Sequence, residues 1–188
     1  MDGETGGVLR GDAVRVLDDW CAPDRDQEEL RKRYLRHLAE HVDGMWRGCR
    51  PEHVTASALV VDGAGDNTLL TLHKTVGRWL QLGGHCEPGD VTLSGAALRE
   101  ATEESGLTNL TVGREPLRLS RHLLLAGGCA GVYHLDVQFL VTATADTQYV
   151  VSEESEDLAW FPIDELPPDT DSSVRDLAAR ARDHLSRN

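Results

Sequence analysis

The chain has 188 residues, of which 40% are hydrophobic, and this is enough for one domain with a sizeable core plus additions. A net charge of −13 argues against binding of polymeric nucleic acid, which depends on phosphate neutralisation by lysine and arginine. No apolar run approaches the ~20 residues that cross a bilayer and no signal peptide is visible, so we expect no membrane partner. The cysteines (Cys21, Cys49, Cys86 and Cys129) lack C-x-x-C spacing. They are typical of free thiols and predict a cytoplasmic location.

The first 50 residues have a helical pattern. Asp12 is placed to cap a first helix, which Pro23 ends. A second helix is expected at about 26–43. Its apolar stripe comprises Leu30, Tyr34, Leu35, Leu38 and Val42. We expect this helical hairpin to serve in packing or dimerisation, with a substrate lid as the less favoured alternative.

From Val54 the hydrophobic period changes to that of strands. We expect strands at about 54–62, 68–74, 79–84, 108–114, 117–125, 132–143 and 158–161, with a helix between the third and fourth. A final helix begins near Asp171, Ser172 or Ser173. Its apolar stripe comprises Val174, Leu177, Ala178, Ala181 and Leu185. This order predicts an α+β fold, an α/β/α sandwich around a mixed sheet.

Three glutamates of the middle helix, Glu100, Glu103 and Glu104, have the spacing i, i+3, i+4. They project from one helix face with Cβ atoms roughly 5–6 Å apart, so their charges repel one another. A hard cation such as Mg²⁺ removes this repulsion, because carboxylate oxygens are its preferred protein ligands. The spacing predicts a divalent-metal site suited to chemistry on phosphates, against the simpler interpretation of a solvated acidic surface.

The residues around these glutamates favour the metal site. Gly106 follows the last turn of the helix and can cap it. The Gly83-Gly84 pair is expected to form a tight turn that points a backbone carbonyl at the metal. The opposite helix face can pack closely on a sheet, because its residues are small or apolar: Ala96, Ala97, Leu98 and Ala101.

This run resembles the box of the Nudix hydrolases, G-x5-E-x7-R-E-U-x-E-E-x-G-U, where U is a bulky aliphatic residue. The matching positions are Gly84, Arg99, Glu100, Glu103, Glu104, Gly106 and Leu107. Asp90 stands at the first glutamate of the box, eight residues rather than seven separate it from Arg99, and Ala101 replaces the bulky aliphatic. Seven ordered matches are far more specific than a lone glycine motif.

The resemblance implies a Nudix-like mixed sheet between helices over residues 51–188, with the box at 84–107 and an N-terminal helical extension at 1–50. The implied reaction is metal-dependent hydrolysis of the P–O–P linkage of a nucleoside diphosphate joined to another moiety. The substrate would be a small phosphorylated molecule, a nucleotide derivative. The helical extension and the habit of the family favour a homodimer.

The resemblance also implies roles for the residues of the box. The Gly84 carbonyl, Glu103 and Glu104 would hold Mg²⁺ or Mn²⁺, and Glu100 would be a further ligand or the base that activates water. Arg99 would position the first helical glutamate by pairing with carboxylates. We expect Arg99 to point to another side of the helix from Glu103.

Three further pairs of polar residues are candidates for substrate binding: Lys74 and Arg78, His134 and Asp136, and Glu153 and Glu154. The first pair flanks a turn and could meet phosphate, or could be solvated loop charges. The second pair lies two apart on one expected strand, so both side chains face the same side of a sheet. The third pair lies in an acidic loop and could supply a distal metal ligand or base, or be plain surface.

Two other functions stay open. A Nudix fold can sense a nucleotide without cleaving it, but a pure sensor has no need of three clustered carboxylates. Isopentenyl diphosphate isomerases resemble Nudix enzymes but use a catalytic cysteine with histidine and glutamate metal ligands, and that set cannot be mapped here. Cys86 lies inside the box, where we expect an inert thiol.

Overall fold

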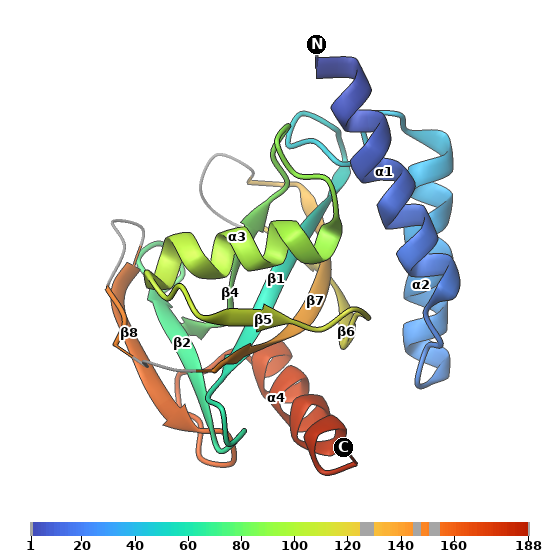
Figure 1. The fold of residues 1–188 in the computed structure, drawn as a ribbon. Helices are drawn as coiled ribbons and strands as arrows, with labels where there is room; N and C mark the ends of the chain where they lie inside the picture. Colours follow the sequence, from blue (N-terminus) through green and yellow to red (C-terminus); the bar gives the residue numbers. More distant parts are fainter. Residues whose placement is uncertain (1, 125–129, 145–147, 151–154, 188) are drawn as a thin grey trace.

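The computed structural model describes residues 2–124, 130–144, 148–150 and 155–187. Figure 1 shows the arrangement of its elements. The helices are α1 (Asp2–Asp19), α2 (Arg25–Glu40), α3 (Leu93–Ser105) and α4 (Ser172–Leu185). The strands are β1 (Glu52–Val61), β2 (Asn67–His73), β3 (Trp79–Leu80), β4 (Leu82–His85), β5 (Leu110–Val112), β6 (Arg118–Leu123), β7 (Tyr133–Ala143) and β8 (Ser155–Pro162).

These strands form one mixed sheet with β1 and β7 at its centre. The two run parallel, with Val54 opposite Leu135 and Val60 opposite Val141. The other strand pairings are antiparallel: β2 and β4 pair with β1, β5 and β6 pair with β7, and β3 and β8 pair with β2. The sheet lies between helices, which confirms the predicted α+β sandwich.

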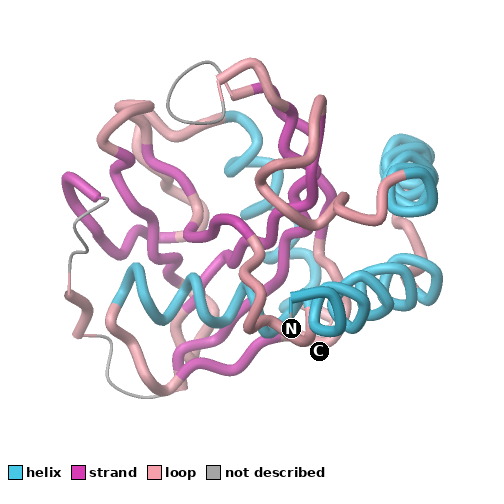
Figure 2. The backbone as a smooth tube through the Cα atoms, turned by 90° about the horizontal axis from the view of Figure 1, so that it is seen from above, coloured by secondary structure: helices cyan, strands magenta, loops and turns pink. Residues whose placement is uncertain are grey.

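The helices divide between the two faces of the sheet. One face packs against α1, α2 and α3 through a shared apolar core that includes Leu17, Tyr34, Ala97 and Phe139. The other face packs against α4 through Leu59 and its apolar neighbours. The two N-terminal helices lie side by side at one side of the molecule (Figures 1 and 2). They share a core with the sheet, so packing, one of the two roles expected of the hairpin, is what the structure shows.

Side chains alternate strictly along β1 and β7, and this alternation positions the polar residues of the sheet. On the face toward α3, both strands are apolar except for Glu52 at the start of β1. On the opposite face, both strands carry polar residues in their first half and, except for Thr142, apolar residues in their second. The polar residues are His53, Thr55 and Ser57 on β1 and His134, Asp136 and Gln138 on β7. They form a buried polar lane across the sheet.

Three expectations for the elements were wrong in detail. Asp12 lies inside α1 rather than at its start, and its carboxylate accepts a hydrogen bond of 2.9 Å from the Leu93 backbone N–H, at the first residue of α3. Val42 is 83% exposed and lies beyond the end of α2. The strand expected at 79–84 is divided at Gln81, because β3 pairs with β2 and β4 pairs with β1.

None of the helices in the described part of the chain combines the length and the apolar character that a membrane crossing requires.

Candidate active site

Helix α3 carries the three glutamates, and it ends at Gly106 as the sequence predicts. The Thr92 side chain caps the first turn by accepting a hydrogen bond of 3.0 Å from the Gly95 backbone N–H. Gly106 adopts a left-handed conformation with φ of 69° at the other end, a conformation that glycine adopts without a Cβ clash. The small face packs on the sheet, since Ala96, Ala97 and Ala101 are fully buried. The acidic face is therefore turned away from the core.

Arg99 is the centre of a network of ion pairs beside this acidic face. Its Nε and Nη2 donate to the two carboxylate oxygens of Asp90 at 3.0 and 3.1 Å. Its Nη1 donates to Glu100 Oε1 at 3.1 Å and to Glu103 Oε2 at 2.9 Å. The hydrogen bonds that Arg99 donates to Asp90, and then the charge of Glu100, raise the pKa of the Arg99 guanidinium above its usual value. Asp90 thus makes the orienting contact that the resemblance assigns to a longer glutamate.

The network corrects one expectation about α3. Arg99 and Glu103 are four residues apart and lie on the same side of the helix, as the i, i+4 spacing requires. The guanidinium also offsets part of the repulsion among the carboxylates. Repulsion alone is consequently weaker support for a bound cation than the sequence suggested.

The diglycine pair lies in strand β4 and not in a turn. Gly83 has φ of 147°, and a Cβ there would lie 2.3 Å from the Ser57 Cβ, so only glycine allows β4 to approach β1 this closely. A Cβ on Gly84 would lie 2.8 Å from Glu100 Oε1. The pair therefore allows two close contacts: Gly83 with Ser57 of the polar lane, and Gly84 with the carboxylate of Glu100.

The donor set of this site fits a hard divalent cation. Glu100, Glu103 and Glu104 supply only carboxylate oxygens, which Mg²⁺ and Mn²⁺ prefer. The Glu100 side chain is 14% exposed and that of Glu103 is 59% exposed, so the group spans the boundary between protein and solvent. Because Gly84 has no side chain, the Glu100 carboxylate can lie directly against its backbone.

The six substrate candidates fall in different places. Lys74 and Arg78 are both exposed in the loop between β2 and β3, and Arg78 lies 3.7 Å from the carboxylate of Asp171, the cap of α4. Glu153 and Glu154 lie outside the described residues.

His134 and Asp136 face the same side of the sheet, as predicted, and both are buried. Asp136 Oδ2 accepts hydrogen bonds from Ser57 Oγ at 2.7 Å and from Gln138 Nε2 at 3.0 Å. Its Oδ1 accepts from Thr55 Oγ1 at 3.0 Å. Neutral donors from β1 and β7 thus hold this carboxylate in the polar lane.

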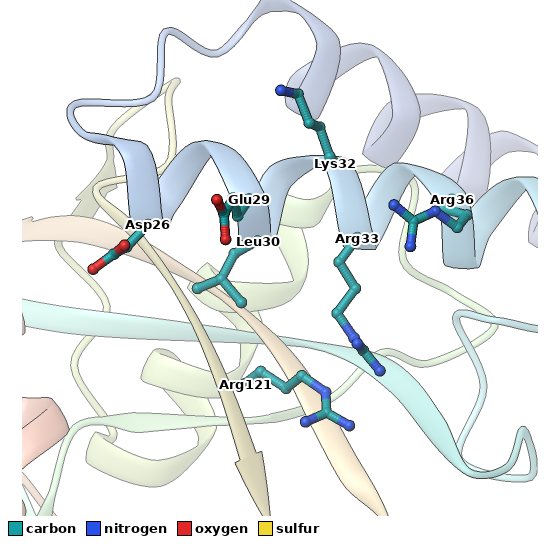
Figure 3. Close-up of a pocket in the computed structure, with 7 residues that line it drawn as sticks. All are labelled: Asp26, Glu29, Leu30, Lys32, Arg33, Arg36 and Arg121. Carbon is teal, nitrogen blue, oxygen red and sulfur yellow. The ribbon is translucent and has the colours of Figure 1, made fainter.

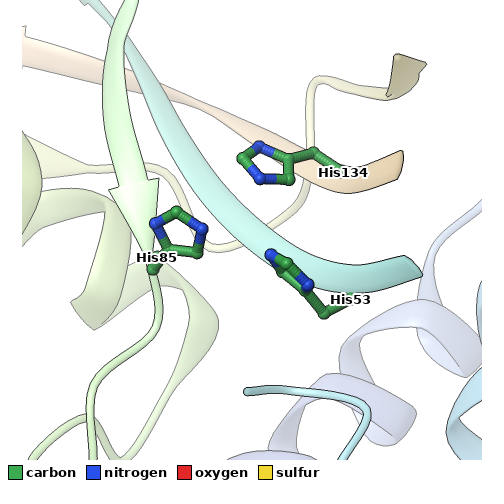
Figure 4. A group of neighbouring side chains, drawn as sticks. All are labelled: His53, His85 and His134. Carbon is green, nitrogen blue, oxygen red and sulfur yellow. The ribbon is translucent and has the colours of Figure 1, made fainter. Parts of the chain in front are cut away.

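The structure adds two histidines that the sequence interpretation did not select. His53 on β1 and His85 at the end of β4 lie against His134, with ring centroids 4.9 to 5.1 Å apart (Figure 4). Burial, with smaller effects from neighbouring histidines, lowers the pKa of His134 to about 3 and that of His85 to about 4. Burial also lowers the pKa of His53. All three imidazoles are therefore neutral at pH 7.

A polar hollow of about 660 Å³ lies elsewhere, between α2 and β6 (Figure 3). Its lining residues are Asp26, Glu29, Leu30, Lys32, Arg33, Arg36 and Arg121. Arg33 and Arg121 both donate to Glu52 Oε2, at 2.9 and 3.0 Å. The hollow contains none of the predicted site residues, and its charges are partly paired, so we place the chemistry at α3 instead.

The Cys86 side chain is not suited to thiol catalysis. It is 5% exposed, and burial, with the charge of Asp90, raises its pKa to about 12. A thiol in that environment stays protonated and unreactive at neutral pH. This finding argues against the isomerase alternative.

The fold is a mixed sheet between helices, and the acidic face of α3 is suited to a hydrolase of acid anhydrides. The NUDIX domain family model matches residues 51–181, well over half of the chain. The chain therefore belongs to the Nudix hydrolase family and is, in the general sense of that family, a pyrophosphohydrolase. A comparison with curated proteins found no match.

Solved structures with the same fold come from several organisms. A NUDIX family hydrolase from Clostridium perfringens is 26% identical, with a TM-score of 0.59, and the match covers 71% of this chain and 97% of that one. An Ap4A hydrolase from C. elegans is 19% identical, with a TM-score of 0.60 over 72% of this chain and 98% of that one. The NUDIX domain of Shewanella oneidensis NrtR, solved with ADP ribose, is 17% identical, with a TM-score of 0.58 over 80% and 97%.

Proposed function

We propose that this enzyme hydrolyses the P–O–P linkage of a nucleoside diphosphate joined to another moiety, with Mg²⁺ or Mn²⁺ as its cofactor. The observation that carries the proposal is the site on α3. There, Glu100 lies against the side-chain-free Gly84, Glu100 and Glu103 both accept hydrogen bonds from Arg99, and Asp90 holds Arg99 in place. A bound divalent cation supplies Lewis-acid chemistry, because it neutralises diphosphate charge and lowers the pKa of coordinated water.

The residues divide into ligands and a positioning residue. Glu103, Glu104 and the Gly84 carbonyl hold the cation, and Glu100 is a further ligand or the base that takes the proton of the attacking water. Arg99 acts through the carboxylates: its three nitrogens bond Asp90, Glu100 and Glu103, which fixes the rotamers of the two glutamates. A guanidinium presents these donors in one rigid plane, which lysine cannot reproduce.

We propose a nucleotide derivative as substrate. Two structures of the same fold carry such compounds in their names, Ap4A for the C. elegans hydrolase and ADP ribose for the NrtR domain. In this chain, His134 and Asp136 are proposed to line the substrate cleft, and Lys74 and Arg78 are proposed for phosphate. Glu153 and Glu154 are proposed to supply a distal metal ligand or base.

The remaining proposals concern organisation. We propose that residues 1–50 are an extension of a Nudix domain at 51–188, with the box at 84–107. The shared core of α1, α2 and the sheet supports a fixed rather than a mobile extension. A cytoplasmic homodimer is likewise our proposal, and size-exclusion chromatography with light scattering tests its dimeric state.

The proposal is tested with nucleoside triphosphates, nucleotide sugars, ADP-ribose and dinucleoside polyphosphates, each with and without Mg²⁺, and with the products resolved by anion-exchange chromatography. We expect Mg²⁺-dependent cleavage at the diphosphate of at least one compound. Glu104→Gln is expected to lower kcat by at least about 100-fold, because a bound cation contributes several kcal/mol to catalysis. The matched control is Glu115→Gln, at an exposed glutamate outside the box.

Two outcomes contradict the proposal. Tight nucleotide binding with no turnover of any compound would favour the sensing module instead. Full metal-dependent activity in Glu104→Gln would remove the ligand assignment.

A further inference from the structure

Three histidines from separate strands form a compact cluster at one end of the polar lane (Figure 4). Each of His53, His85 and His134 offers one ring nitrogen, and these three nitrogens lie within 4.8 Å of one another. The rings point toward one another from β1, β4 and β7. In the sheet, His53 pairs with His134, and His85 pairs with Thr55, two residues along β1 on the same face as His53. The strand register therefore brings the three histidines together.

Two of these rings leave a buried nitrogen without a hydrogen bond. Among the residues that the structure describes, His53 Nε2 and His134 Nε2 are inaccessible to solvent and have no hydrogen-bond partner. His53 Nδ1 lies 3.2 Å from the backbone carbonyl oxygen of Cys49 and donates to it, which leaves the lone pair on Nε2. This arrangement is the one that metal-binding histidines adopt: one nitrogen is held by an outer hydrogen bond while the other coordinates. Burying an unpaired polar nitrogen is otherwise unfavourable.

We propose that His53, His85 and His134 form a second metal site, for a transition metal of the zinc type. Imidazole nitrogens suit Zn²⁺, Co²⁺ and Ni²⁺, whereas Mg²⁺ prefers oxygen ligands. A tetrahedral zinc ion with bonds of about 2.0–2.1 Å holds its nitrogen ligands about 3.3 Å apart, so the rings close on the ion by shifts of about 1 Å. Three protein ligands leave one coordination position open, the composition of a site that takes water or another small ligand.

This site is distinct from the carboxylate site on α3. Gly84 and His85 are neighbours in β4, so they face opposite sides of the sheet. Gly84 lies against Glu100, while His85 lies against His53 and His134. The two sites therefore differ in place and in ligand chemistry. The second site rests on the geometry of the histidines and not on the proposed function, although His134 is also one of the substrate candidates.

A second group of ligand atoms in the described residues competes for the same class of ion: His41, Asp43 and Cys49. It is the weaker candidate, because Asp43 is exposed and holds no fixed position in the core. Burial and the nearby Asp43 raise the pKa of Cys49 to about 11, so an ion bound there must also displace the thiol proton. The sulfur of Cys49 gives the experiment a means of telling the two groups apart.

The test is metal titration of the whole purified protein after chelator treatment. Zn²⁺ affinity is measured by competition with a chromophoric chelator in excess Mg²⁺, and Co²⁺ is used as an optical probe. We expect one equivalent of Zn²⁺ to bind, and Co²⁺ to give d–d bands without a thiolate charge-transfer band. His134→Gln and His53→Gln are each expected to raise the Kd for Zn²⁺ more than about 100-fold. Loss of an outer hydrogen-bond partner alone lowers metal affinity by about 10–100-fold, and loss of a ligand should lower it further.

The matched controls keep the cluster intact. Cys49→Ser retains the backbone carbonyl that accepts from His53, and Glu104→Gln alters only the carboxylate site, so both are expected to keep the Zn²⁺ affinity. X-ray absorption of the zinc-loaded wild-type protein, with imidazole scattering and no sulfur, supports the site even if the histidine variants do not fold. Absence of a stoichiometric zinc ion, unchanged affinity in folded His134→Gln, or a thiolate band abolished by Cys49→Ser would overturn the proposal.

Discussion

The carboxylate of Asp90 receives two parallel hydrogen bonds from Arg99, of 3.0 and 3.1 Å. Asp90 is one methylene shorter than the glutamate of the Nudix box and is one residue further from the arginine in sequence. The contact is nevertheless bidentate, and a third bond of 2.7 Å from the Glu87 backbone N–H holds the same carboxylate. The loop before α3 thus accommodates the shorter side chain and the extra residue, and the guanidinium still contacts the glutamates of the helix.

The first prediction concerns this buried ion pair. Asp90→Asn removes the charge that faces Arg99, and we expect the free energy of unfolding to fall by about 1.5–3 kcal/mol, as for hydrogen bonds to charged groups. Asp90 is 7% exposed, so solvent cannot replace the lost contact. Urea denaturation measures the change. Asp19→Asn is the control, since Asp19 is 75% exposed and 3.9 Å from its partner, and should change stability by less than about 0.5 kcal/mol. Equal effects of the two substitutions would contradict the account.

The second prediction uses the space beside Gly84. In Gly84→Ala the new methyl group would lie 2.8 Å from Glu100 Oε1, so the carboxylate must move. We expect the Mg²⁺ concentration for half-maximal activity to rise and kcat to fall, each by about tenfold, the size of a loss of about 1.4 kcal/mol. Gly89→Ala is the control, because nothing lies within 4 Å of a Cβ there. If both variants have wild-type metal dependence, Gly84 has no part in the site.

The third prediction concerns the link between α1 and α3. Asp12→Ala removes the carboxylate that accepts from the Leu93 N–H, and loss of such a cap lowers helix or protein stability by about 0.5–2 kcal/mol. Gly11→Ala, one residue earlier in the same helix, has open space around its Cβ. It is expected to raise stability by about 0.5–1 kcal/mol. Thermal and urea unfolding of both variants check this, and an unchanged Asp12→Ala protein would show that α1 does not fix the start of α3.

The fourth prediction follows from the three neutral histidines. Their folded pKa values lie below the ordinary value of about 6.5, so below pH 6.5 the unfolded chain binds protons that the folded protein does not. The contribution of these three histidines to the stability of the metal-free protein is therefore constant above about pH 6.5 and falls as the pH drops toward 4, by up to about 1.4 kcal/mol per pH unit for each group. His134→Gln should make the slope between pH 6.5 and 4 shallower. An identical slope in that variant would show that burial does not hold His134 neutral.

Much of the fold could be predicted because it depends on local patterns. The cap at Gly106, the small face of α3 and the apolar stripe of α4 are all set by residues close in sequence, and each was found as predicted. The glutamate spacing likewise defines one helix face without knowledge of the sheet. Arg99 is the exception: its i, i+4 relation to Glu103 was readable from the same rule, and the expectation of a different side was wrong.

What could not be predicted depends on contacts between distant segments. The histidine cluster requires the register of β1 against β7 and β4, since His53 and His134 are far apart in the chain. The pattern His-x-Thr-x-Ser on β1, followed by His-x-Asp-x-Gln on β7, was the available signal, because polar residues at alternate positions of a buried strand indicate a shared polar face. The expectation of a turn at Gly83-Gly84 is wrong, because glycine is found both in turns and at close contacts between strands. Only the position of Ser57 in the neighbouring strand distinguishes these two roles.

The central claim is that the acidic face of α3 holds a divalent cation, and a crystal structure grown in Mn²⁺ tests it most directly through the anomalous signal of the metal. We expect an anomalous peak bounded by the carboxylates of Glu103 and Glu104 and the backbone carbonyl of Gly84. Those carboxylates pointing into solvent, with no peak between them and β4, would contradict the account.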